Sequence, residues 1–228
     1  MRVESAVGYS EDRDALAQDW TRFLSKALPD CRWMLIPNLG PPVVDFVRAW
    51  GLEGIIFTGG NDVGTCPVRD KTESLLMGFA LENWIPSFGV CRGLHMVQHH
   101  LGGNVQACPK EGHVATRHGI RCEAMAGGVS RRVVNSFHSQ GVRLDDLAPG
   151  VAATALSEDG WVEAIRHQSA PLTAIQWHPE RNETPDPEDV ALIREAFGLE
   201  PLEEIAPAFL YTRNQPFLTP LTFPPCVP

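Results

Sequence analysis

Short apolar runs alternate with amphipathic stretches along the first hundred residues. The apolar runs predict strands at residues 3–9, 33–37, 54–58 and 86–90. Apolar residues at helical spacing predict helices at residues 12–28, 43–50, 70–83 and 92–101. The run at 54–58 lacks polar alternation, which is typical of a strand buried on both faces. This order of strands and helices predicts an α/β fold with a mainly parallel central sheet covered by helices on both faces.

After residue 102, the alternation of apolar runs and amphipathic stretches becomes less regular. Short runs at 118–125, 131–137 and 151–157, joined by Gly-rich turns, predict antiparallel edge strands. Residues 161–167 and 172–177 restore strand alternation, and residues 186–197 predict a last helix that Pro187 can open. Prolines are too frequent in residues 201–228 for regular structure. We therefore expect one domain over residues 1–199 and a Pro-rich C-terminal arm over residues 200–228.

Composition narrows the function classes. The chain has 228 residues and a net charge of -9, and its basic residues are scattered, so a nucleic-acid partner is not expected. No apolar stretch approaches the length of a membrane span, and the first residues lack the pattern of a secretory leader, so we expect a cytoplasmic protein without a membrane partner. The six cysteines form no C-x-x-C pair, so each is judged as a single thiol.

The strongest local signal is the segment Phe88–Gly93, which lies between a predicted buried strand and a predicted helix. It has the form G-x-C-x-G, the cysteine version of a nucleophile elbow, in which a sharp turn lifts the side chain out of the sheet. The thiol of Cys91 would sit at a helix N-terminus, whose partial positive charge favours the thiolate. A buried cysteine that only ends a strand is the alternative.

Two further strand ends supply complementary groups. His178 and Glu180 follow the predicted strand at 172–177, so an imidazole base and a carboxylate that fixes its tautomer come from one turn. Thr58–Gly60 follows the buried strand at 54–58 and offers a backbone N–H for an oxyanion, paired with the N–H of Arg92. Each signal alone has an ordinary explanation: His178 could be a surface histidine, and Thr58–Gly60 could be a tight turn without a function. The three signals together indicate a cysteine-dependent acyl-transfer site.

The motifs resemble those of the class I glutamine amidotransferase superfamily, and within it the gamma-glutamyl hydrolase-like group, peptidase family C26, which is similar to gamma-glutamyl-gamma-aminobutyrate hydrolase. The matching pieces are FTGGNDV at 57–63, RDKTE at 69–73, PSFGVCRGLHMVQHHLGG at 86–103, VNSFHSQGV at 134–142, EDGWVEAI at 158–165 and AIQWHPE at 174–180. The resemblance covers residues 1–198 and implies a flavodoxin-like three-layer sandwich.

The resemblance implies a Cys-His-Glu triad. Cys91 is the expected nucleophile, His178 the general base and acid, and Glu180 the carboxylate that orients His178. Gly60 and Arg92 are expected to supply the oxyanion N–H groups. The expected substrate-binding residues are Gly59, His95, Asn135, Ser136, Phe137 and His138. For the segment 135–138, a hairpin held by bonds to its own backbone is the competing interpretation.

The expected activity is hydrolysis of a gamma-glutamyl amide through a thioester, with glutamate and an amine or an amidated small molecule, such as a CDP-amidate, as products. One alternative is a glutaminase subunit that delivers ammonia to a separate synthetase, and another is a catalytically silent binding protein on the same fold. A homodimer or a synthetase is the possible protein partner. Relatives usually carry Gln at the position of His95, which suggests a different preference for the glutamyl end.

Several side features favour ordinary explanations. His95 and His99 have the i, i+4 spacing of a metal pair, with His100 alongside, and no third ligand is evident. We therefore expect no metal and no organic cofactor. His113 and His118 are expected at the surface. Arg131–Arg132 could meet a phosphate on the leaving group, although solvated arginines are more common.

Overall fold

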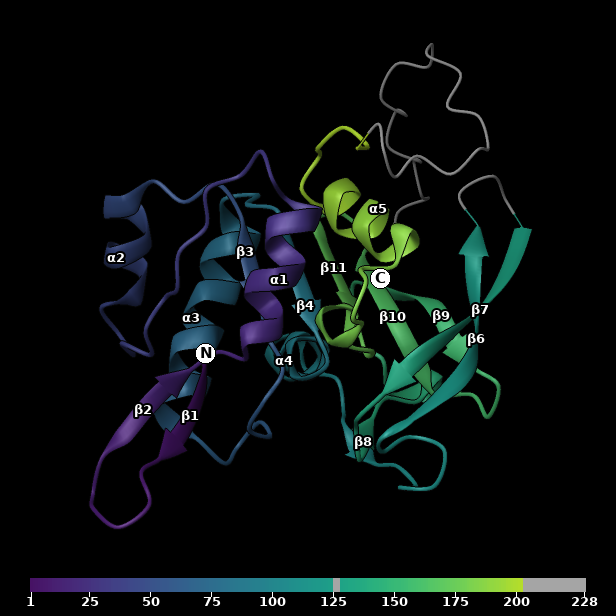
Figure 1. Cartoon of the computed structure of the whole chain (residues 1–228), viewed down its shortest axis with the longest axis horizontal. Helices are drawn as coiled ribbons and strands as arrows, with labels where there is room; N and C mark the ends of the chain where they lie inside the picture. The colour runs from purple at the N-terminus through teal and green to yellow at the C-terminus, as the bar shows by residue number, and fades with distance from the viewer. Residues whose placement is uncertain (125–127, 203–228) are drawn as a thin grey trace, which may run out of the picture.

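The computed structural model describes residues 1–124 and 128–202. Its largest sheet has seven strands in the order β3-β4-β11-β10-β9-β6-β7 (Figure 1). Their bounds are β3 (Ile55–Phe57), β4 (Ser87–Val90), β6 (Thr116–Ala124), β7 (Gly128–Ser136), β9 (Val151–Ser157), β10 (Val162–His167) and β11 (Leu172–Ile175). β3, β4 and β11 pair in parallel, and the other neighbours pair antiparallel.

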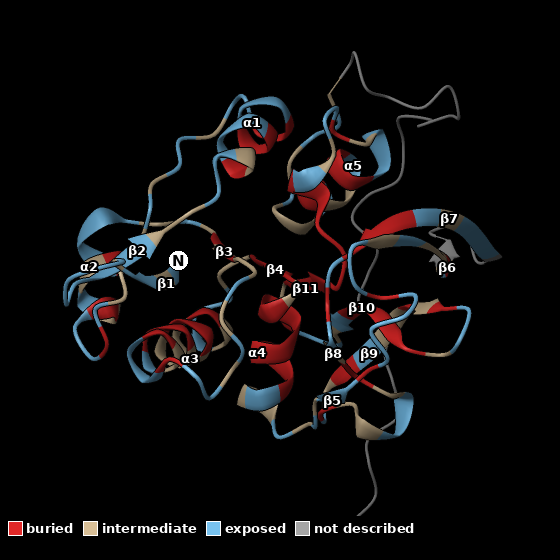
Figure 2. Cartoon of the chain, turned by 60° about the horizontal axis from the view of Figure 1, so that its bottom comes forward, coloured by how far each residue is buried: buried red, intermediate tan, exposed pale blue. Residues whose placement is uncertain are grey.

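Helices cover both faces of the parallel strands. α1 (Gln18–Ala27) and α5 (Pro187–Ala196) pack on one face, together with Phe88 and Ile175 from the strands. α2 (Val43–Trp50), α3 (Pro67–Glu82) and α4 (Arg92–Leu101) contribute to the core on the other face, which contains Phe57 and Ala174. Figure 2 shows the buried helix sides turned toward the sheet. The predicted three-layer α/β fold is confirmed.

The expected parallel order is wrong for the first two predicted strands. β1 (Arg2–Ser5) and β2 (Asp12–Ala15) form a separate antiparallel hairpin. This hairpin carries charged residues on both strands and turns near Gly8 at φ 95°, so it cannot be buried between two helical layers. Residues 33–37 form no ladder within the described chain, and Trp33 and Leu35 are 41% and 45% exposed. The sheet is therefore mixed, and its parallel part is restricted to β3, β4 and β11.

Most other elements match the predicted ranges closely, because their periodicity is strong. The remaining short elements are β5 (Gln106–Ala107), β8 (Gln140–Gly141), η1 (Leu144–Asp146) and η2 (Pro179–Arg181). Residues 203–228, nearly all of the predicted C-terminal arm, lie outside the described residues. In the part of the chain that is described, no helix has the length and apolar character needed to cross a membrane.

Candidate active site

Cys91 lies at the junction of β4 and α4 with φ 52° and ψ -103°, a backbone conformation that is strained for any residue but glycine. The turn is fixed by a hydrogen bond from the Cys91 N–H to the Ile175 carbonyl at 2.7 Å. A Cβ on Gly93 would overlap the Phe57 carbonyl oxygen, and one on Gly89 would lie 2.8 Å from the Ala174 Cβ. Both flanking glycines are therefore required for β4 and α4 to meet at this angle, as the elbow prediction expects.

His178 and Glu180 form a buried pair directly after β11. His178 Nδ1 lies 2.7 Å from Glu180 Oε1, and each residue is 3% exposed. Burial lowers the pKa of His178, but contacts with the Cys91 thiol and the Glu180 carboxylate outweigh it and raise this pKa to about 9. The pair holds the ring with Nδ1 directed at the carboxylate, so Nε2 is left for proton exchange.

The glycine corner after β3 lies against the same histidine. A Cβ on Gly59 would be 2.8 Å from His178 Cε1 and 3.7 Å from Cys91 Cβ, so only glycine fits between them. Arg69 Nη2 donates to the carbonyl oxygens of Thr58 and Gly59 at 2.8 and 3.0 Å. Because N–H and C=O point in opposite directions across a trans peptide, this contact turns the Gly60 N–H away from Arg69.

Arg69 belongs to a buried charge network for which the sequence analysis predicted no role. Arg69 Nε donates to Glu73 Oε1 at 2.8 Å, and the Arg92 guanidinium contacts both Glu73 and Asp70. Burial, followed by the neighbouring Arg69, lowers the pKa of Arg92 to about 10, so both guanidinium groups stay charged. The i, i+4 spacing of Arg69 and Glu73 on a helix is the signal that could have identified the network. It ties α3 to the first turn of α4, and thus to the Cys91 elbow.

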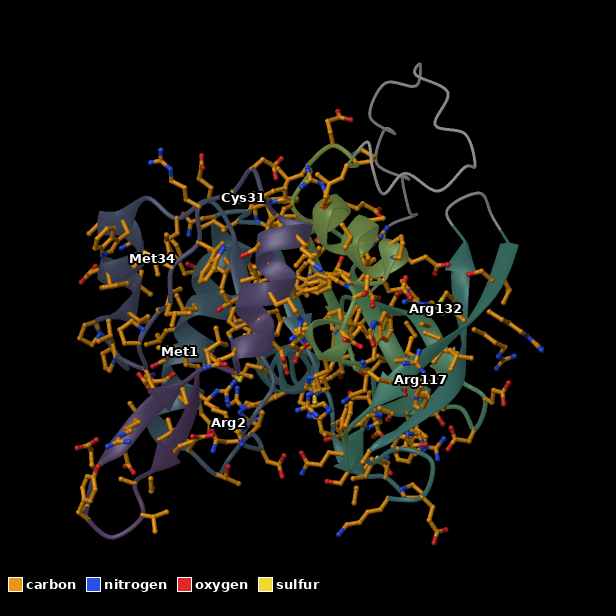
Figure 3. The ribbon with its side chains drawn as sticks, viewed as in Figure 1. Met1, Arg2, Cys31, Met34, Arg117 and Arg132 are labelled. Atoms are coloured by element: carbon orange, nitrogen blue, oxygen red, sulfur yellow. The ribbon has the colours of Figure 1, made fainter. Side chains whose placement is uncertain are left out.

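These residues surround one cavity of about 220 Å³. Among the predicted site residues, those that line it are Gly59, Gly60, Cys91, Arg92, His95, Phe137, His138, His178 and Glu180. Arg2, which lies on the N-terminal hairpin and is labelled in Figure 3, also lines the cavity. The hairpin that does not join the main sheet thus contributes a positive charge beside the elbow.

His95 contacts the thiol through Gln176. His95 Nε2 lies 2.9 Å from Gln176 Oε1, and Gln176 Nε2 lies 3.7 Å from Cys91 Sγ. Burial, followed by the charge of His138, lowers the pKa of His95 to about 4, so its imidazole is neutral near pH 7. His95 therefore lies at the cavity wall, and Gln176 is a neighbour of Cys91 that the sequence analysis missed.

Asn135 and Ser136 form hydrogen bonds to backbone groups and do not line the cavity. Asn135 donates to the His178 carbonyl at 2.7 Å and accepts from the His178 N–H at 2.9 Å. Ser136 Oγ donates to the His113 carbonyl at 2.7 Å. Neither residue is among the described residues that line the cavity, because both side chains are committed to neighbouring segments. Asn135 thus holds the turn that carries His178, and Ser136 holds the segment that contains His113.

Phe137 and His138 meet the cavity in different ways. Phe137 is 37% exposed, and its ring lies edge-on to His178 with centroids 5.8 Å apart. His138 is 3% exposed, and its Nδ1 lies 2.9 Å from the Gln140 carbonyl oxygen. Phe137 is therefore available to a substrate, whereas the His138 ring is held against its own chain.

Two side-chain expectations need correction. Arg132, which is labelled in Figure 3, contacts Asp186, Glu188 and Asp189 at 2.9–3.4 Å. It therefore anchors β7 to the start of α5 and is not free for a phosphate. His113, expected at the surface, is 2% exposed. Local sequence patterns do not indicate this burial, because the groups that surround His113 come from separate strands.

Comparison with known proteins supports the motif assignments. Residues 34–180 match the family model Peptidase C26. The chain is 25% identical over 202 residues to gamma-glutamyl-CDP-amidate hydrolase of Campylobacter jejuni, covering 84% of this chain and 92% of the relative. It is 31% identical over 146 residues to gamma-glutamyl-gamma-aminobutyrate hydrolase PuuD of Escherichia coli, covering 54% of this chain and 57% of that protein.

The fold also matches solved structures. The glutaminase domain of a Trypanosoma brucei CTPS, solved with bound acivicin, aligns with a TM-score of 0.59 at 18% identity. The alignment covers 80% of this chain and 87% of that chain. At this identity the likeness bears on the fold, and it agrees with the three-layer arrangement of helices and sheet.

Proposed function

The chain belongs to the peptidase C26 family, and from this premise we propose that it hydrolyses a gamma-glutamyl amide bond with Cys91 as the nucleophile. The observation that carries the proposal is the meeting of three strand ends at one cavity. Cys91 in its strained elbow, the His178–Glu180 pair at 2.7 Å and the Gly59–Gly60 corner all border it. This set provides a nucleophile, a base with a fixed tautomer and backbone donors, the parts that acyl transfer needs.

In the first half-reaction, the Cys91 thiolate attacks the gamma-carbonyl carbon and forms a C–S bond. The carbonyl oxygen takes up negative charge, and the N–H groups of Gly60 and Arg92 stabilise it. His178, protonated at Nε2, gives its proton to the leaving nitrogen, so that the C–N bond breaks and the amine departs. A pKa of His178 near 9 fits this step, because the imidazolium is the main form at neutral pH.

In the second half-reaction, neutral His178 takes a proton from water, and the hydroxide attacks the thioester carbon. The C–S bond breaks, glutamate leaves, and the thiolate and imidazolium are restored. Glu180 keeps Nδ1 of His178 oriented throughout. Each step uses only side chains and backbone that border the cavity, together with substrate and water.

The glutamyl part and the leaving group meet different walls. Arg2 brings positive charge to the cavity wall, where a glutamyl alpha-carboxylate would find a counter-charge. The exposed Phe137, with the Arg181 guanidinium 4.1 Å from its ring centroid, forms a flat apolar edge beside His178. We infer that the leaving group is an amine or amidated small molecule whose body rests on this edge.

Labelling with a glutamine-like diazoketone tests the nucleophile. We expect one label per chain, mapped to Cys91, and no label in Cys91→Ala. Cys31→Ala is the matched control, because Cys31 is also half-buried, and burial raises the pKa of its thiol. Labelling that persists in Cys91→Ala, or that disappears in Cys31→Ala, contradicts the assignment.

Product analysis on three substrates separates the candidate activities. Glutamine, gamma-glutamyl-gamma-aminobutyrate and gamma-glutamyl-CDP-amidate are incubated with the purified chain, and released glutamate is measured. Turnover of either larger amide above that of glutamine supports the hydrolase. Turnover of glutamine alone, stimulated by a synthetase, supports the glutaminase-subunit alternative. Labelling of Cys91 without turnover of any amide supports a binding protein.

A further inference from the structure

A second cluster of reactive side chains lies behind the cavity wall, in the antiparallel part of the sheet. It consists of His113, His118, His138 and Glu163, whose ligand atoms all lie within 4.8 Å of one another. Three of these residues are 0–3% exposed, and the side chain of His118 is 14% exposed. The proposed reaction uses none of the four as a proton donor, a proton acceptor or a nucleophile.

The inward atoms of the cluster have no hydrogen-bond partner among the residues that the structure describes. They are Nδ1 of His113, Nε2 of His118, Nε2 of His138 and both carboxylate oxygens of Glu163. A carboxylate that is fully buried without a donor carries a large desolvation cost, and buried polar groups in folded proteins are normally paired. Within the described residues, the centre of the cluster therefore lacks a group that pairs with these atoms.

The outward nitrogens of the three imidazoles are all occupied. His113 Nε2 lies 2.9 Å from Asp159 Oδ2, His118 Nδ1 lies 3.0 Å from the Gly112 carbonyl, and His138 Nδ1 lies 2.9 Å from the Gln140 carbonyl. Each of these acceptors takes a ring N–H, so in the neutral imidazole the lone pair of the other nitrogen faces the cluster. Histidines that bind a metal have this arrangement, in which a carboxylate or backbone carbonyl fixes the tautomer from behind.

Two of the separations between inward atoms are close to those around a tetrahedral ion. His118 Nε2 and His138 Nε2 lie 3.3 and 3.5 Å from Glu163 Oε1. Bond lengths of about 2.0–2.2 Å to zinc place tetrahedral ligand atoms about 3.4 Å apart. These separations are longer than good N–H···O hydrogen bonds, so they fit ligands around a central ion better than direct pairs.

We propose that His113, His118, His138 and Glu163 bind one divalent transition-metal ion. This ion is zinc, because three imidazoles and one carboxylate are a ligand set that suits zinc. The four ligands fill the tetrahedral positions and are buried, which is the arrangement of a structural site without an open position. They come from the loop before β6, from β6, from the segment after β7 and from β10. The ion joins these segments, and His138 links it to the wall that also contains Phe137. Its role is to hold this wall in place.

Metal analysis of tag-free protein tests the site directly. Inductively coupled plasma mass spectrometry is expected to find about one zinc ion per chain after purification without added metal. Glu163→Gln and His118→Gln are expected to lose at least about nine-tenths of this content, with His118→Gln serving if Glu163→Gln does not fold. His99→Gln is the matched control, because His99 is exposed and belongs to the His-rich end of α4. It is expected to keep its metal.

Two further measurements sharpen the result. Cobalt(II) added to metal-free protein should give the intense visible bands of a tetrahedral site, and Asp159→Asn should weaken zinc affinity by about 10–100-fold through the His113 tautomer. Chelation should lower the melting temperature by about 10 °C, restored by zinc. If one equivalent of another transition metal is found instead, the proposed site is supported and its ion is that metal, not zinc.

The competing account is a buried ion pair in which protons on the imidazoles balance Glu163. Burial lowers the pKa of His118 and of His138, but the Glu163 carboxylate raises both by more. This account predicts protein without bound metal, no uptake of zinc or cobalt at equimolar concentration, and a melting temperature unaffected by chelators. That outcome would overturn the proposal, as would equal metal content in His118→Gln and His99→Gln.

Discussion

The parallel and antiparallel parts of the sheet contribute to the site in different ways. In the parallel part, β4 ends directly before Cys91, and β3 and β11 end three residues before Gly60 and His178, so adjacent strand ends bring the groups together. In the antiparallel part, β6, β7 and β10 bring polar side chains together that are far apart in the sequence. The parallel part therefore supplies the reacting groups, whereas the antiparallel part holds one wall of the cavity.

One residue connects the two parts at the catalytic turn. Asn135, at the end of β7, forms two hydrogen bonds to the backbone of His178, which follows β11. The orientation of His178 thus depends on Glu180 within its own turn and on Asn135 from the antiparallel part. Substitutions on either side can measure how much each part contributes.

The largest effects are expected within the parallel part, for His178→Ala and then for Glu180→Gln. Glu180→Gln keeps the shape of the side chain but removes the negative charge beside His178 Nδ1, so we expect kcat/KM to fall by about 10²-fold or more, and by less than in His178→Ala. Because Glu180 raises the pKa of His178, removing its charge lowers that pKa from about 9. The alkaline fall of kcat/KM should then begin at a lower pH. A pH–rate profile with an unchanged alkaline limb would contradict this role.

The elbow itself is tested by Gly93→Ala. The new Cβ would overlap the Phe57 carbonyl oxygen, a backbone atom of β3, so we expect the free energy of unfolding to fall by about 1–3 kcal/mol. Gly78→Ala is the matched control, because Gly78 lies within α3 and its Cβ would be 3.5 Å from the nearest atom of His100. The control should be as stable as the parent or about 1 kcal/mol more stable. Urea unfolding of both variants measures the difference, and equal losses would mean that the close approach is not what requires glycine.

The same comparison explains how much could be predicted from the sequence. The elbow, the glycine corner and the His178 turn are short segments at the ends of apolar strands, so periodicity and local motifs identify them. The prediction for the N-terminal strands was wrong because a hydrophobic run does not specify the strand with which it pairs. β1 and β2 pair with each other in a local hairpin. The sequence analysis missed the histidine cluster for a related reason. Only His113 and His118 have a spacing known from zinc sites, with four residues between them, and the pairing of β6, β7, β9 and β10 brings His138 and Glu163 to them.

A smaller effect is expected where the two parts join, for Asn135→Ala. This variant leaves the buried N–H and C=O of His178 without their side-chain partners, which costs about 1–3 kcal/mol. We expect kcat to fall by about 10-fold because the imidazole is oriented less firmly. Asn104→Ala is the control, since Asn104 is exposed and bonds only to Asp146 through its side chain. Steady-state kinetics and a melting curve on both variants check this expectation. Full activity in Asn135→Ala would show that the orientation of His178 depends on its own turn and not on Asn135.

The smallest effect is expected for His95→Gln. His95 touches Gln176, and Gln176 touches the thiol, so the imidazole acts on substrate binding without exchanging a proton. The shorter amide should shift Gln176 toward His95, and we expect KM or the preference among gamma-glutamyl amides to change several-fold, with kcat within about 2-fold.

Two measurements distinguish a role in substrate recognition from one in packing. Because the pKa of His95 is about 4, its neutral form prevails at pH 6 and at pH 8, and the ratio of KM values between variant and parent should be the same at both. Kinetics on glutamine and on two larger amides, at both pH values and beside a melting curve, provide the comparison. A lower melting temperature with KM and kcat intact on every substrate would show that His95 only fills the interface between α4 and β11. A change in KM at constant melting temperature would instead show that a residue behind Gln176 tunes what the parallel part of the sheet accepts.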